Sequence, residues 1–411
     1  MTFLYTTGIY FYTLISHLLS PFNTKARQFV KGRKNWSGKL TRQIETNARY
    51  IWVHCASLGE FEQGRPLIEA IKERHPEYRI ILTFFSPSGY EIRKNYPLAD
   101  IISYLPVDTP KNARKFIRIT NPEKAFFVKY EYWYFYISEL KKQNIPLYQV
   151  SAIFRESQLF FKENRWGKWY RELLHQFTHF FVQDKKSEEL LASIGITNVS
   201  LAGDTRFDRV AAIAAGAKKL PLVEKFRGDS SLIVAGSTWK PDEEMLAAFI
   251  NNGAYIKMII APHEVSATNI NRLQQMLKTP SVLYSAAENE DLAAKQVLII
   301  DSVGLLSSLY RYGDAAYIGG GFGVGIHNIL EAATFGLPVI FGPNYQKFKE
   351  AVDLIKKGGA FTIKDFAELK AVLEKLLSNK KFLEKASAVN KEYVDENVGA
   401  TFLIIKKVFN K

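Results

Sequence analysis

Two glutamates follow apolar runs of the sequence, at places where a parallel sheet would present them to a ligand. Glu60 closes the segment Ser57-Leu58-Gly59-Glu60, and Glu131 lies within an aromatic-rich segment. A carboxylate can act as a general base when burial or charged neighbours raise its pKa. The Ser-x-x-Glu spacing is also that of a capping box, which would supply backbone amides to Glu60 and make it less basic. The sequence therefore leaves two roles open for Glu60, a catalytic base and a helix cap.

Other residues that follow apolar runs in this half of the chain could bind a substrate. Ser57 and Gly59 belong to the first segment, and a glycine there lets a substrate approach the backbone closely. Glu131 has six aromatic neighbours within residues 130–136. They form either the apolar start of a helix or an aromatic wall with the carboxylate aimed at the ligand. Arg155 follows a later apolar run and is a candidate contact for an anion, although a lone arginine is more often solvated.

A glycine-rich loop is the strongest feature of the second half of the chain. Five glycines fall within Gly319–Gly325, after an apolar run and before a helix that is expected to begin near His327. Free backbone amides and the dipole at a helix N-terminus suit a phosphate group. Glu331, one turn into that helix, could accept hydrogen bonds from ribose hydroxyls. The loop matches neither GxGxxG nor GxxxxGK[ST], so neither a Rossmann dinucleotide site nor a P-loop is indicated.

Two shorter segments of the same half also follow apolar runs. Gly236 and Ser237 come after the first run, and Pro262 and His263 come after the second. At the ends of strands they would be placed to contact the phosphates and base of a nucleotide. The sequence contains no Asp-x-Asp motif, no HExxH motif and a single cysteine. We therefore predict no metal site, no cofactor and no disulfide framework.

Short apolar runs alternate with helical patterns, as in βαβ units with parallel sheets. The helical patterns include Glu60–Arg74 and Lys185–Ile194. The first series of runs is Tyr50–Cys55, Tyr78–Phe85, Ile101–Leu105, Ala125–Val128, Leu147–Ile153, His179–Val182 and Val199–Ala202. The second is Leu232–Ala235, Ile256–Ala261, Val282–Tyr284, Val297–Ile300, Ala315–Ile318 and Pro338–Phe341. The prediction is an α/β protein of two doubly wound, Rossmann-like domains that face each other across a cleft.

The interval without apolar runs between the two series places the domain boundary near residues 205–230. The predicted organisation is an N-terminal anchor over 1–24, a first domain over 25–205, a linker over 206–230, a second domain over 231–386 and a final helix over 387–411. That final helix could return to the N-terminal domain.

The composition is that of a basic globular protein. The 411 residues contain 55 Lys plus Arg and 41 Asp plus Glu, so the net charge is 55 − 41 = +14. Hydrophobic residues make up 47% of the chain, which suits two domains with sizeable cores. A positive protein attracts nucleic acids or anionic membranes. We expect a membrane and no nucleic acid, because the basic residues are densest beside the apolar N-terminus.

Residues 1–24 carry no charged side chain, and no acidic residue occurs before Glu45. The basic residues that follow are Lys25, Arg27, Lys31, Arg33, Lys34, Lys39 and Arg42. This order predicts a membrane anchor with its basic flank on the cytoplasmic side. Polar residues dilute the segment, so spanning the bilayer and lying in its interface are both open. The alternative is a helix packed on the protein's own core.

Five segments taken together resemble the 3-deoxy-D-manno-octulosonic acid (Kdo) transferases, glycosyltransferases with the GT-B fold. They are WVHCASLGEFEQGRPLI, KYEYW, IPLYQVSAIFRESQ, LAGDTRFDRV and GGGFGVGIHNILEAATFGLPVIFGPNYQKF. With the N-terminal segment they extend in order over nearly the whole chain, which makes the resemblance far more specific than any single motif.

The resemblance implies transfer of Kdo from CMP-Kdo to a lipid A precursor, at the cytoplasmic face of the inner membrane in lipopolysaccharide synthesis. It implies inversion at the anomeric carbon without a metal ion. Glu60 would be the base and Glu131 the second acidic residue, near the acceptor. Gly320, Gly321 and Asn328, together with Glu331, would belong to the donor loop and helix that hold CMP.

The sequence departs from the family pattern in the donor half. A Pro-Arg-His segment is common in the family, whereas this chain has Pro262-His263-Glu264. Lys240 and Arg272 are weak candidates to replace the missing arginine. The alternative function is that of another GT-B enzyme with a UDP-sugar substrate, such as a lipid-linked N-acetylglucosamine transferase or a 2-epimerase.

Overall fold

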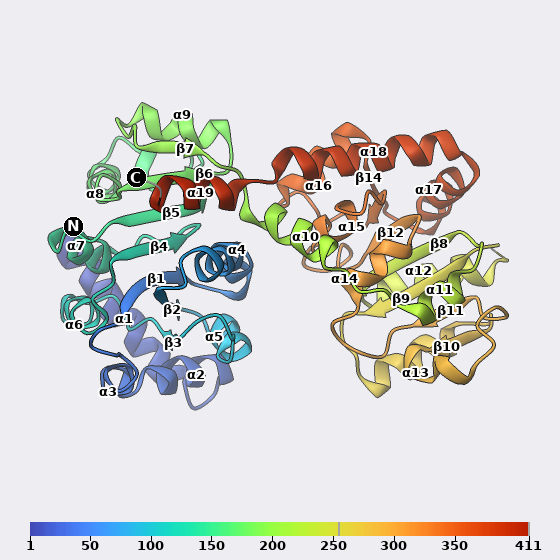
Figure 1. Cartoon of the computed structure of the whole chain (residues 1–411), viewed down its shortest axis with the longest axis horizontal. Coiled ribbons are helices and arrows are strands. Elements are labelled where there is room, and N and C mark those ends of the chain that lie inside the picture. Colours follow the sequence, from blue (N-terminus) through green and yellow to red (C-terminus); the bar gives the residue numbers. More distant parts are fainter. Residues whose placement is uncertain (254, 410–411) are drawn as a thin grey trace. The chain divides into compact units, whose positions relative to one another are not determined.

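The computed structural model describes residues 1–253 and 255–409. The chain forms two compact units, each with its own sheet (Figure 1). Unit 1 comprises Met1–Arg209 together with the C-terminal segment from Val398, and unit 2 comprises Val210–Asn397.

Unit 1 contains a parallel sheet of seven strands in the order β3-β2-β1-β4-β5-β6-β7. The strands are β1 (Arg49–Cys55), β2 (Tyr78–Phe84), β3 (Ile101–Tyr104), β4 (Lys124–Val128), β5 (Leu147–Ala152), β6 (His179–Val182) and β7 (Val199–Leu201). Every residue of β1 after Arg49 is buried, because helices pack on both faces of the sheet. Burial on both faces is the reason that these strands have continuous apolar sequences.

The helices of unit 1 form two cores, one on each face of the sheet. They are α1 (Thr2–Leu19), α2 (Thr24–Arg33), α3 (Trp36–Thr41), α4 (Leu58–Arg74), α5 (Pro87–Arg93), α6 (Pro110–Thr120), α7 (Tyr134–Lys142), η1 (Leu159–Phe161), α8 (Arg165–Leu174), α9 (Lys185–Ser193) and α19 (Ala400–Phe409). Trp52 and Tyr136 belong to one core. Phe61 of α4 and Ile404 of α19 belong to the other, so the C-terminal helix completes unit 1.

Unit 2 contains a second parallel sheet, in the order β10-β11-β9-β8-β12-β13-β14. Its strands are β8 (Leu232–Thr238), β9 (Lys257–Pro262), β10 (Ser281–Leu283), β11 (Val297–Ile299), β12 (Ala315–Ile318), β13 (Val339–Phe341) and β14 (Ala360–Thr362). Its helices are α11 (Pro221–Arg227), α12 (Lys240–Asn251), α13 (Ala267–Met276), η2 (Tyr284–Asn289), α14 (Leu306–Leu309), η3 (Tyr310–Tyr312), α15 (Leu330–Ala333), α16 (Lys349–Lys357), α17 (Phe366–Ser378) and α18 (Lys380–Asn397). The short β14, which follows two glycines, has no counterpart among the apolar runs of the sequence.

The segment that the sequence marks as a linker, 206–230, is mostly helical. It contains most of α10 (Thr205–Ala215) and all of α11. Pro221 is the first residue of α11 and Gly228 is its C-cap, so these residues mark helix ends. The C-terminal segment 387–411 also differs from the single expected helix. It comprises the end of α18, in unit 2, and α19, in unit 1, while residues 410 and 411 lie outside the described residues.

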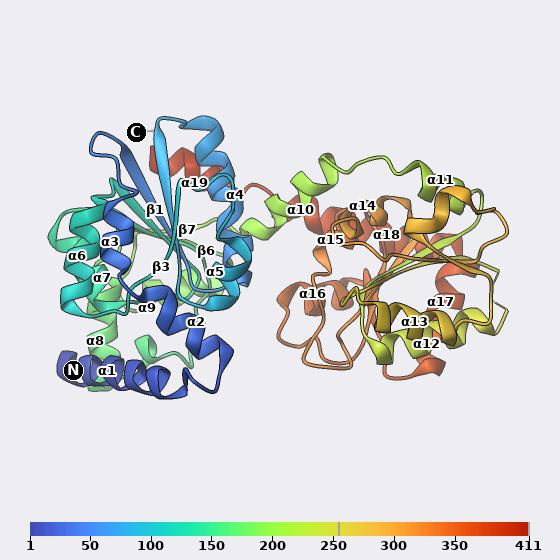
Figure 2. The same cartoon turned by 90° about the horizontal axis from the view of Figure 1, so that it is seen from below.

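The N-terminal helix α1 packs along one side of unit 1 (Figure 2). Its buried and half-buried positions recur with helical spacing, at Thr2, Tyr5, Thr6, Ile9, Thr13 and Ser16. Within residues 1–253 and 255–409, no helix is both long enough and apolar enough to cross a membrane. Arg33, which belongs to the basic residues after α1, is half-buried and its guanidinium contacts the protein itself. It donates to the carbonyl oxygens of Phe85 and Leu105 at 2.7 and 2.8 Å.

Candidate functional site

Glu60 lies at the carboxyl end of β1, in the first turn of α4. Ser57 and Glu60 form the capping box that their spacing indicates. The Glu60 carboxylate accepts a hydrogen bond from the Ser57 N–H at 2.8 Å and another from the Ser57 hydroxyl at 3.2 Å. Burial raises the pKa of Glu60 and the negative charge of Glu131 raises it further, while His54 and the two Ser57 hydrogen bonds lower it. The effect of burial on the pKa exceeds that of the two hydrogen bonds from Ser57. Glu60 can therefore cap the helix and still have the raised pKa that suits a general base.

Glu131 follows β4 and is held by two donors. Its carboxylate accepts hydrogen bonds from His54 Nε2, at 3.0 Å, and from the indole N–H of Trp133. The other ring nitrogen of His54 lies 2.8 Å from the Thr83 hydroxyl. Glu131 is only 6% exposed. Its carboxylate is therefore fixed in one position beside the first turn of α4, where its charge acts on Glu60.

His54 is a residue of this network that the sequence analysis missed. It lies on β1 within a continuous apolar run and is fully buried. A histidine inside a strand buried on both faces needs polar partners, and that requirement was the available signal. The sequence could not name the partners, because Thr83 and Glu131 come from β2 and from the segment after β4.

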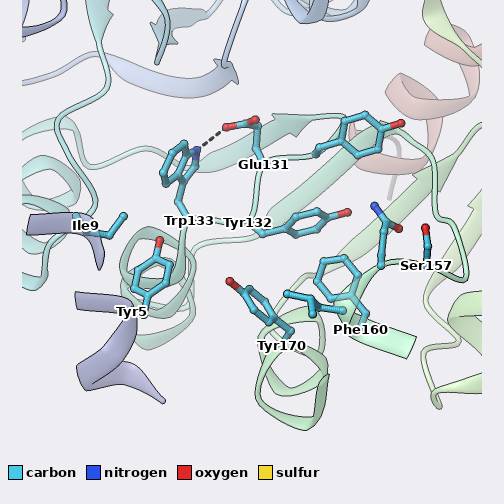
Figure 3. A pocket seen from close by; sticks show the side chains of 11 residues that line it. Tyr5, Ile9, Glu131, Tyr132, Trp133, Ser157, Phe160 and Tyr170 are labelled. Carbon is cyan, nitrogen blue, oxygen red and sulfur yellow. Dashed lines mark hydrogen bonds between the residues drawn. The ribbon is translucent and has the colours of Figure 1, made fainter. Parts of the chain in front are cut away.

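A cavity of about 530 Å³ opens beside Glu131 (Figure 3). Its lining comes from α1, from the segment after β4, and from the region of η1 and α8. The lining residues are Tyr5, Ile9, Tyr130, Glu131, Tyr132, Trp133, Ser157, Gln158, Leu159, Phe160 and Tyr170. Three aromatic residues of the segment, Tyr130, Tyr132 and Trp133, line the cavity. The other three, Tyr134, Phe135 and Tyr136, begin α7, so each predicted alternative describes one part of the segment.

Asp108 connects two of the elements around this cavity, α1 and the start of α7. Its buried carboxylate accepts hydrogen bonds from the Tyr5 hydroxyl at 2.6 Å and from the backbone N–H groups of Phe135 and Tyr136, both at 3.1 Å. It therefore caps the N-terminus of α7 and holds α1 at the same time. Burial raises the pKa of Asp108 to about 6, although all three hydrogen bonds act in the opposite direction.

The other predicted acceptor residues lie near Glu60 or farther along the chain. Gly59 is exposed, and a Cβ atom there would meet nothing within 4 Å, so this chain's own packing does not require the glycine. Arg155 is exposed, and its guanidinium lies 5.9 Å from the centre of the Tyr130 ring. Arg155 does not line the cavity, although its neighbours Ser157 and Gln158 do.

Unit 2 has a cavity of its own, of about 470 Å³, beside the glycine loop. It is lined by Trp239, Pro241, Asp242, His263, Gly320, Phe322, Gly323, Val324, Gly325 and His327. Three of the predicted donor residues, His263, Gly320 and His327, therefore come together here. The other six do not line this cavity: Gly236, Ser237, Pro262, Gly321, Asn328 and Glu331.

Three rings stack in this cavity. Trp239 lies on His263 with ring centres 4.6 Å apart, and His263 lies on His327 at 4.4 Å. The indole N–H of Trp239 donates to His327 Nε2 at 3.1 Å. Because an indole nitrogen can only donate, Nε2 must be unprotonated and the ring proton must sit on Nδ1. Burial and the neighbouring His263 lower the pKa of His327, so the ring offers a neutral N–H donor.

The glycines of the loop are explained partly by packing within unit 2. A Cβ atom on Gly321 would lie 2.6 Å from the backbone of Gly342. Outside the loop, a Cβ atom on Gly236 of β8 would lie 2.1 Å from the Tyr310 hydroxyl. Gly320 has a φ of +91° and its N–H donates to the Asp242 carboxylate at 3.1 Å. That amide is therefore engaged by α12, and the loop conformation is fixed by this contact.

The helix expected to begin near His327 starts three residues later. It is α15, the four residues Leu330–Ala333, and such a short helix has little dipole to offer a phosphate. The Asn328 side chain accepts from the Leu330 N–H at 3.2 Å and donates to Glu331 at 3.1 Å. The two weak cation candidates are engaged elsewhere. Arg272 pairs with Glu243 at 2.7 Å, and Lys240 lies 3.7 Å from Glu244.

Comparison with known sequences identifies relatives along most of the chain. Residues 31–209 match the family model described as 3-Deoxy-D-manno-octulosonic-acid transferase (kdotransferase). A 3-deoxy-D-manno-octulosonic acid transferase of Aquifex aeolicus is 28% identical over 356 residues, which is 84% of this chain and 92% of the relative. One of Haemophilus influenzae is 25% identical over 398 residues, 93% of this chain and 91% of the relative.

Comparison with solved structures shows the fold. A UDP-GlcNAc 2-epimerase from Neisseria meningitidis matches with a TM-score of 0.63 at 15% identity, over 88% of this chain and 100% of the other. MurG of Acinetobacter baumannii matches with a TM-score of 0.56 at 10% identity, over the same shares of the two chains. The two parallel seven-stranded sheets therefore form a GT-B-like fold, and at such low identity the likeness extends to nothing beyond the fold.

Proposed function

Because the chain is a glycosyltransferase of the 3-deoxy-D-manno-octulosonic acid transferase family, we propose that it moves Kdo from CMP-Kdo to a lipid A precursor in lipopolysaccharide biosynthesis. The observation that carries the proposal is the Glu60 carboxylate, whose pKa is raised by burial and by Glu131. A carboxylate with a raised pKa is a stronger base toward the proton of a sugar hydroxyl.

In the proposed step Glu60 removes a proton from the acceptor hydroxyl while that oxygen attacks the anomeric carbon of Kdo. The new acceptor O–C bond forms on the face opposite CMP, so the configuration inverts. The bond from the anomeric carbon to the CMP phosphate oxygen breaks, and its electron pair leaves with CMP. Glu131, fixed by His54 and Trp133, would accept a hydrogen bond from the acceptor sugar. We propose that no divalent ion takes part, since the sequence lacks an Asp-x-Asp motif.

The donor would bind to unit 2, in the cavity beside the glycine loop. The neutral N–H of His327 and the exposed ring of His263 would meet the phosphate or the carboxylate of CMP-Kdo. Asn328 and Glu331 would accept from the ribose hydroxyls at the rim. A merely flexible glycine loop is less consistent with the ordered contact from Gly320 to Asp242.

The acceptor is embedded in a membrane, and we propose that α1 attaches the enzyme to the cytoplasmic face of the inner membrane. Its large exposed apolar residues are Phe3, Leu4, Tyr10, Phe11, Tyr12, Leu14, Ile15, Leu18 and Leu19. A contiguous apolar surface of this size favours a membrane interface. Flotation with anionic lipid vesicles tests the attachment, and protein that stays at the bottom of the gradient would contradict it.

The activity is tested with the variant Glu60→Gln. Wild type is expected to add Kdo, generated as CMP-Kdo in situ, to a tetraacylated lipid A precursor, with the product detected by mass spectrometry. The glutamine keeps a side-chain oxygen for the Ser57 amide but cannot take a proton, so turnover should fall about 10²–10⁴-fold while CMP binding stays. Glu73→Gln, at an exposed position of the same helix, is the matched control. Near-normal turnover of Glu60→Gln would reduce Glu60 to its capping role.

Nucleotide binding separates this proposal from a UDP-sugar enzyme. Titration of the wild type with CMP and with UMP should show tighter binding of CMP. A preference for UMP, with no Kdo transfer, would replace the proposed function by the UDP-sugar alternative.

A further inference from the structure

The cavity beside Glu131 has a chemical character that the catalytic residues do not explain. Its lining is mostly aromatic and aliphatic, and it includes neither lysine nor arginine. Its only ionisable carboxylate is Glu131. A phosphate or a nucleotide would meet no cation here and would be repelled by that acid. The cavity suits an apolar group attached to a polar one.

The N-terminal helix supplies one wall of this cavity. Figure 3 shows Tyr5 and Ile9 of α1 at the left, beside and below Trp133, with Tyr170 below Tyr132. The phenol ring of Tyr132 is enclosed, and its hydroxyl is buried without a hydrogen-bond partner among the described residues. The wall is therefore built by residues that are far apart in the sequence.

Helix α1 is fixed at this place by specific contacts. The Tyr5 hydroxyl donates to Asp108 at 2.6 Å, and the Thr2 hydroxyl donates to the Tyr134 hydroxyl at 3.3 Å. The Tyr5 ring also lies 5.7 Å from the ring of Trp169 on α8. Such contacts hold the N-terminal half of α1 in a fixed position beside the segment after Glu131.

The opposite side of α1 continues the apolar surface away from the cavity. Phe3, Phe11 and Leu18 are 80%, 61% and 65% exposed, and the helix carries no charged residue. An apolar chain that leaves the cavity can therefore remain in contact with apolar side chains along α1.

We propose that α1 is part of the acceptor site and that this cavity takes an acyl chain of the acceptor lipid, next to the sugar held at Glu131. The inference rests on the proposed function, since a lipid acceptor supplies both parts. It assigns Ile9 to binding of the chain and gives α1 a role that attachment to a membrane does not require.

The test replaces the apolar wall and compares two acceptors. Ile9→Gln places an amide in the cavity while preserving the helix, since glutamine is a better helix former than isoleucine. Ile15→Gln makes the same change at an exposed position of the same helix that does not line the cavity. Both variants reduce the apolar character of α1 equally, so the control accounts for altered binding to micelles.

The readout is KM for a tetraacylated acceptor and for its deacylated, water-soluble form, together with Kd for CMP. Each methylene group withdrawn from water is worth about a fourfold change in affinity, so Ile9→Gln should raise KM for the acylated acceptor about tenfold. KM for the deacylated acceptor and Kd for CMP should stay unchanged in both variants. Ile15→Gln reports the effect of weaker attachment alone, so the rise in KM for the acylated acceptor should be about tenfold larger in Ile9→Gln than in Ile15→Gln. An unchanged KM for the acylated acceptor overturns the proposal, as does an equal rise for both acceptors.

A second measurement keeps the inference testable if no Kdo transfer is found, which would refute the proposed function instead. A brominated acyl chain on a neutral detergent-like lipid should quench the fluorescence of Trp133, which lines the cavity. The quenching increment should disappear in Trp133→Phe and weaken in Ile9→Gln but not in Ile15→Gln. Quenching that is identical in Ile9→Gln and wild type would mean that the cavity does not hold the chain.

Discussion

Replacement of Asp108 by asparagine should change how the stability of unit 1 depends on pH. The carboxylate is 1% exposed, and it ties the N-terminus of α7 to Tyr5 of α1. Burial penalises its charged form more than the three hydrogen bonds favour it, which raises its pKa from 3.8 to about 6. Asparagine has a similar shape and does not titrate.

The size and sign of the effect follow from the two pKa values. The folded state holds the proton more tightly than the unfolded state, so Asp108 contributes stability below pH 3.8, and this contribution is lost as pH rises through about 6. The difference of 6 − 3.8 = 2.2 units corresponds to about 3 kcal/mol at about 1.4 kcal/mol per unit. Asparagine cannot accept the Tyr136 N–H while also accepting from Tyr5, which adds a cost of about 1–3 kcal/mol at every pH.

Urea unfolding measures this difference. Trp239 is the one tryptophan of the six outside unit 1, so tryptophan fluorescence reports mainly on that unit. The free energy of unfolding of wild type minus that of Asp108→Asn should fall by about 3 kcal/mol between pH 3.5 and pH 7.5. Asp184→Asn, which changes the N-cap of α9 in the same unit, controls for replacing a capping aspartate by asparagine.

Two results would refute the reasoning. A difference that stays constant to within about 1 kcal/mol over this pH range would mean that burial does not hold the proton on Asp108. A difference that grows with pH would mean that the hydrogen bonds from Tyr5 and α7 outweigh burial, which is the opposite sign.

Three further predictions concern the two sites. Glu131→Gln removes the negative charge that raises the pKa of Glu60, so the acidic limb of the pH–rate profile should move to lower pH, and an unmoved limb would contradict the coupling. Trp239→Phe keeps a ring but removes the N–H that donates to His327. Nitrogen NMR should then show a changed tautomer population of His327, and CMP should bind about threefold to tenfold more weakly. An unchanged tautomer population would show that the indole does not set the tautomer of His327. Glu331→Ala should weaken CMP binding by a similar factor, and an unchanged Kd measured by calorimetry would remove this residue from the donor site.

The sequence predicted the α/β architecture well, because parallel strands buried on both faces have continuous apolar sequences. The runs Tyr50–Cys55 and Ala315–Ile318 are strands, β1 and β12. The three-residue β14 was missed, since so short a run after two glycines carries no periodic signal. The segment 206–230, which the sequence predicts as a linker, contains helices, because a proline and a glycine mark the ends of α11 as readily as they mark a loop.

The candidate site was predicted unevenly. Glu60 and Glu131 could be proposed from their positions after strands, and the capping box from its spacing. The glycine-rich loop could be located from its composition, but the helix after it is only four residues long. Two hydrogen bonds at this loop and the residues after it join segments far apart in the chain. The Gly320 N–H donates to Asp242, and the Trp239 indole N–H donates to His327. No local pattern specifies them.

The sequence by itself determined the elements, their order and the chemical types at their ends, because each depends on residues within a few positions of one another. Only the tertiary structure decided the electrostatic state of those residues. Burial raises the pKa values of Glu60 and Asp108, and burial is set by side chains that arrive from other strands and helices. The same holds for α1. Its sequence indicates an apolar helix, but its place as a wall beside Glu131 depends on contacts with distant segments, such as the hydrogen bond from the Tyr5 hydroxyl to Asp108, 103 residues away.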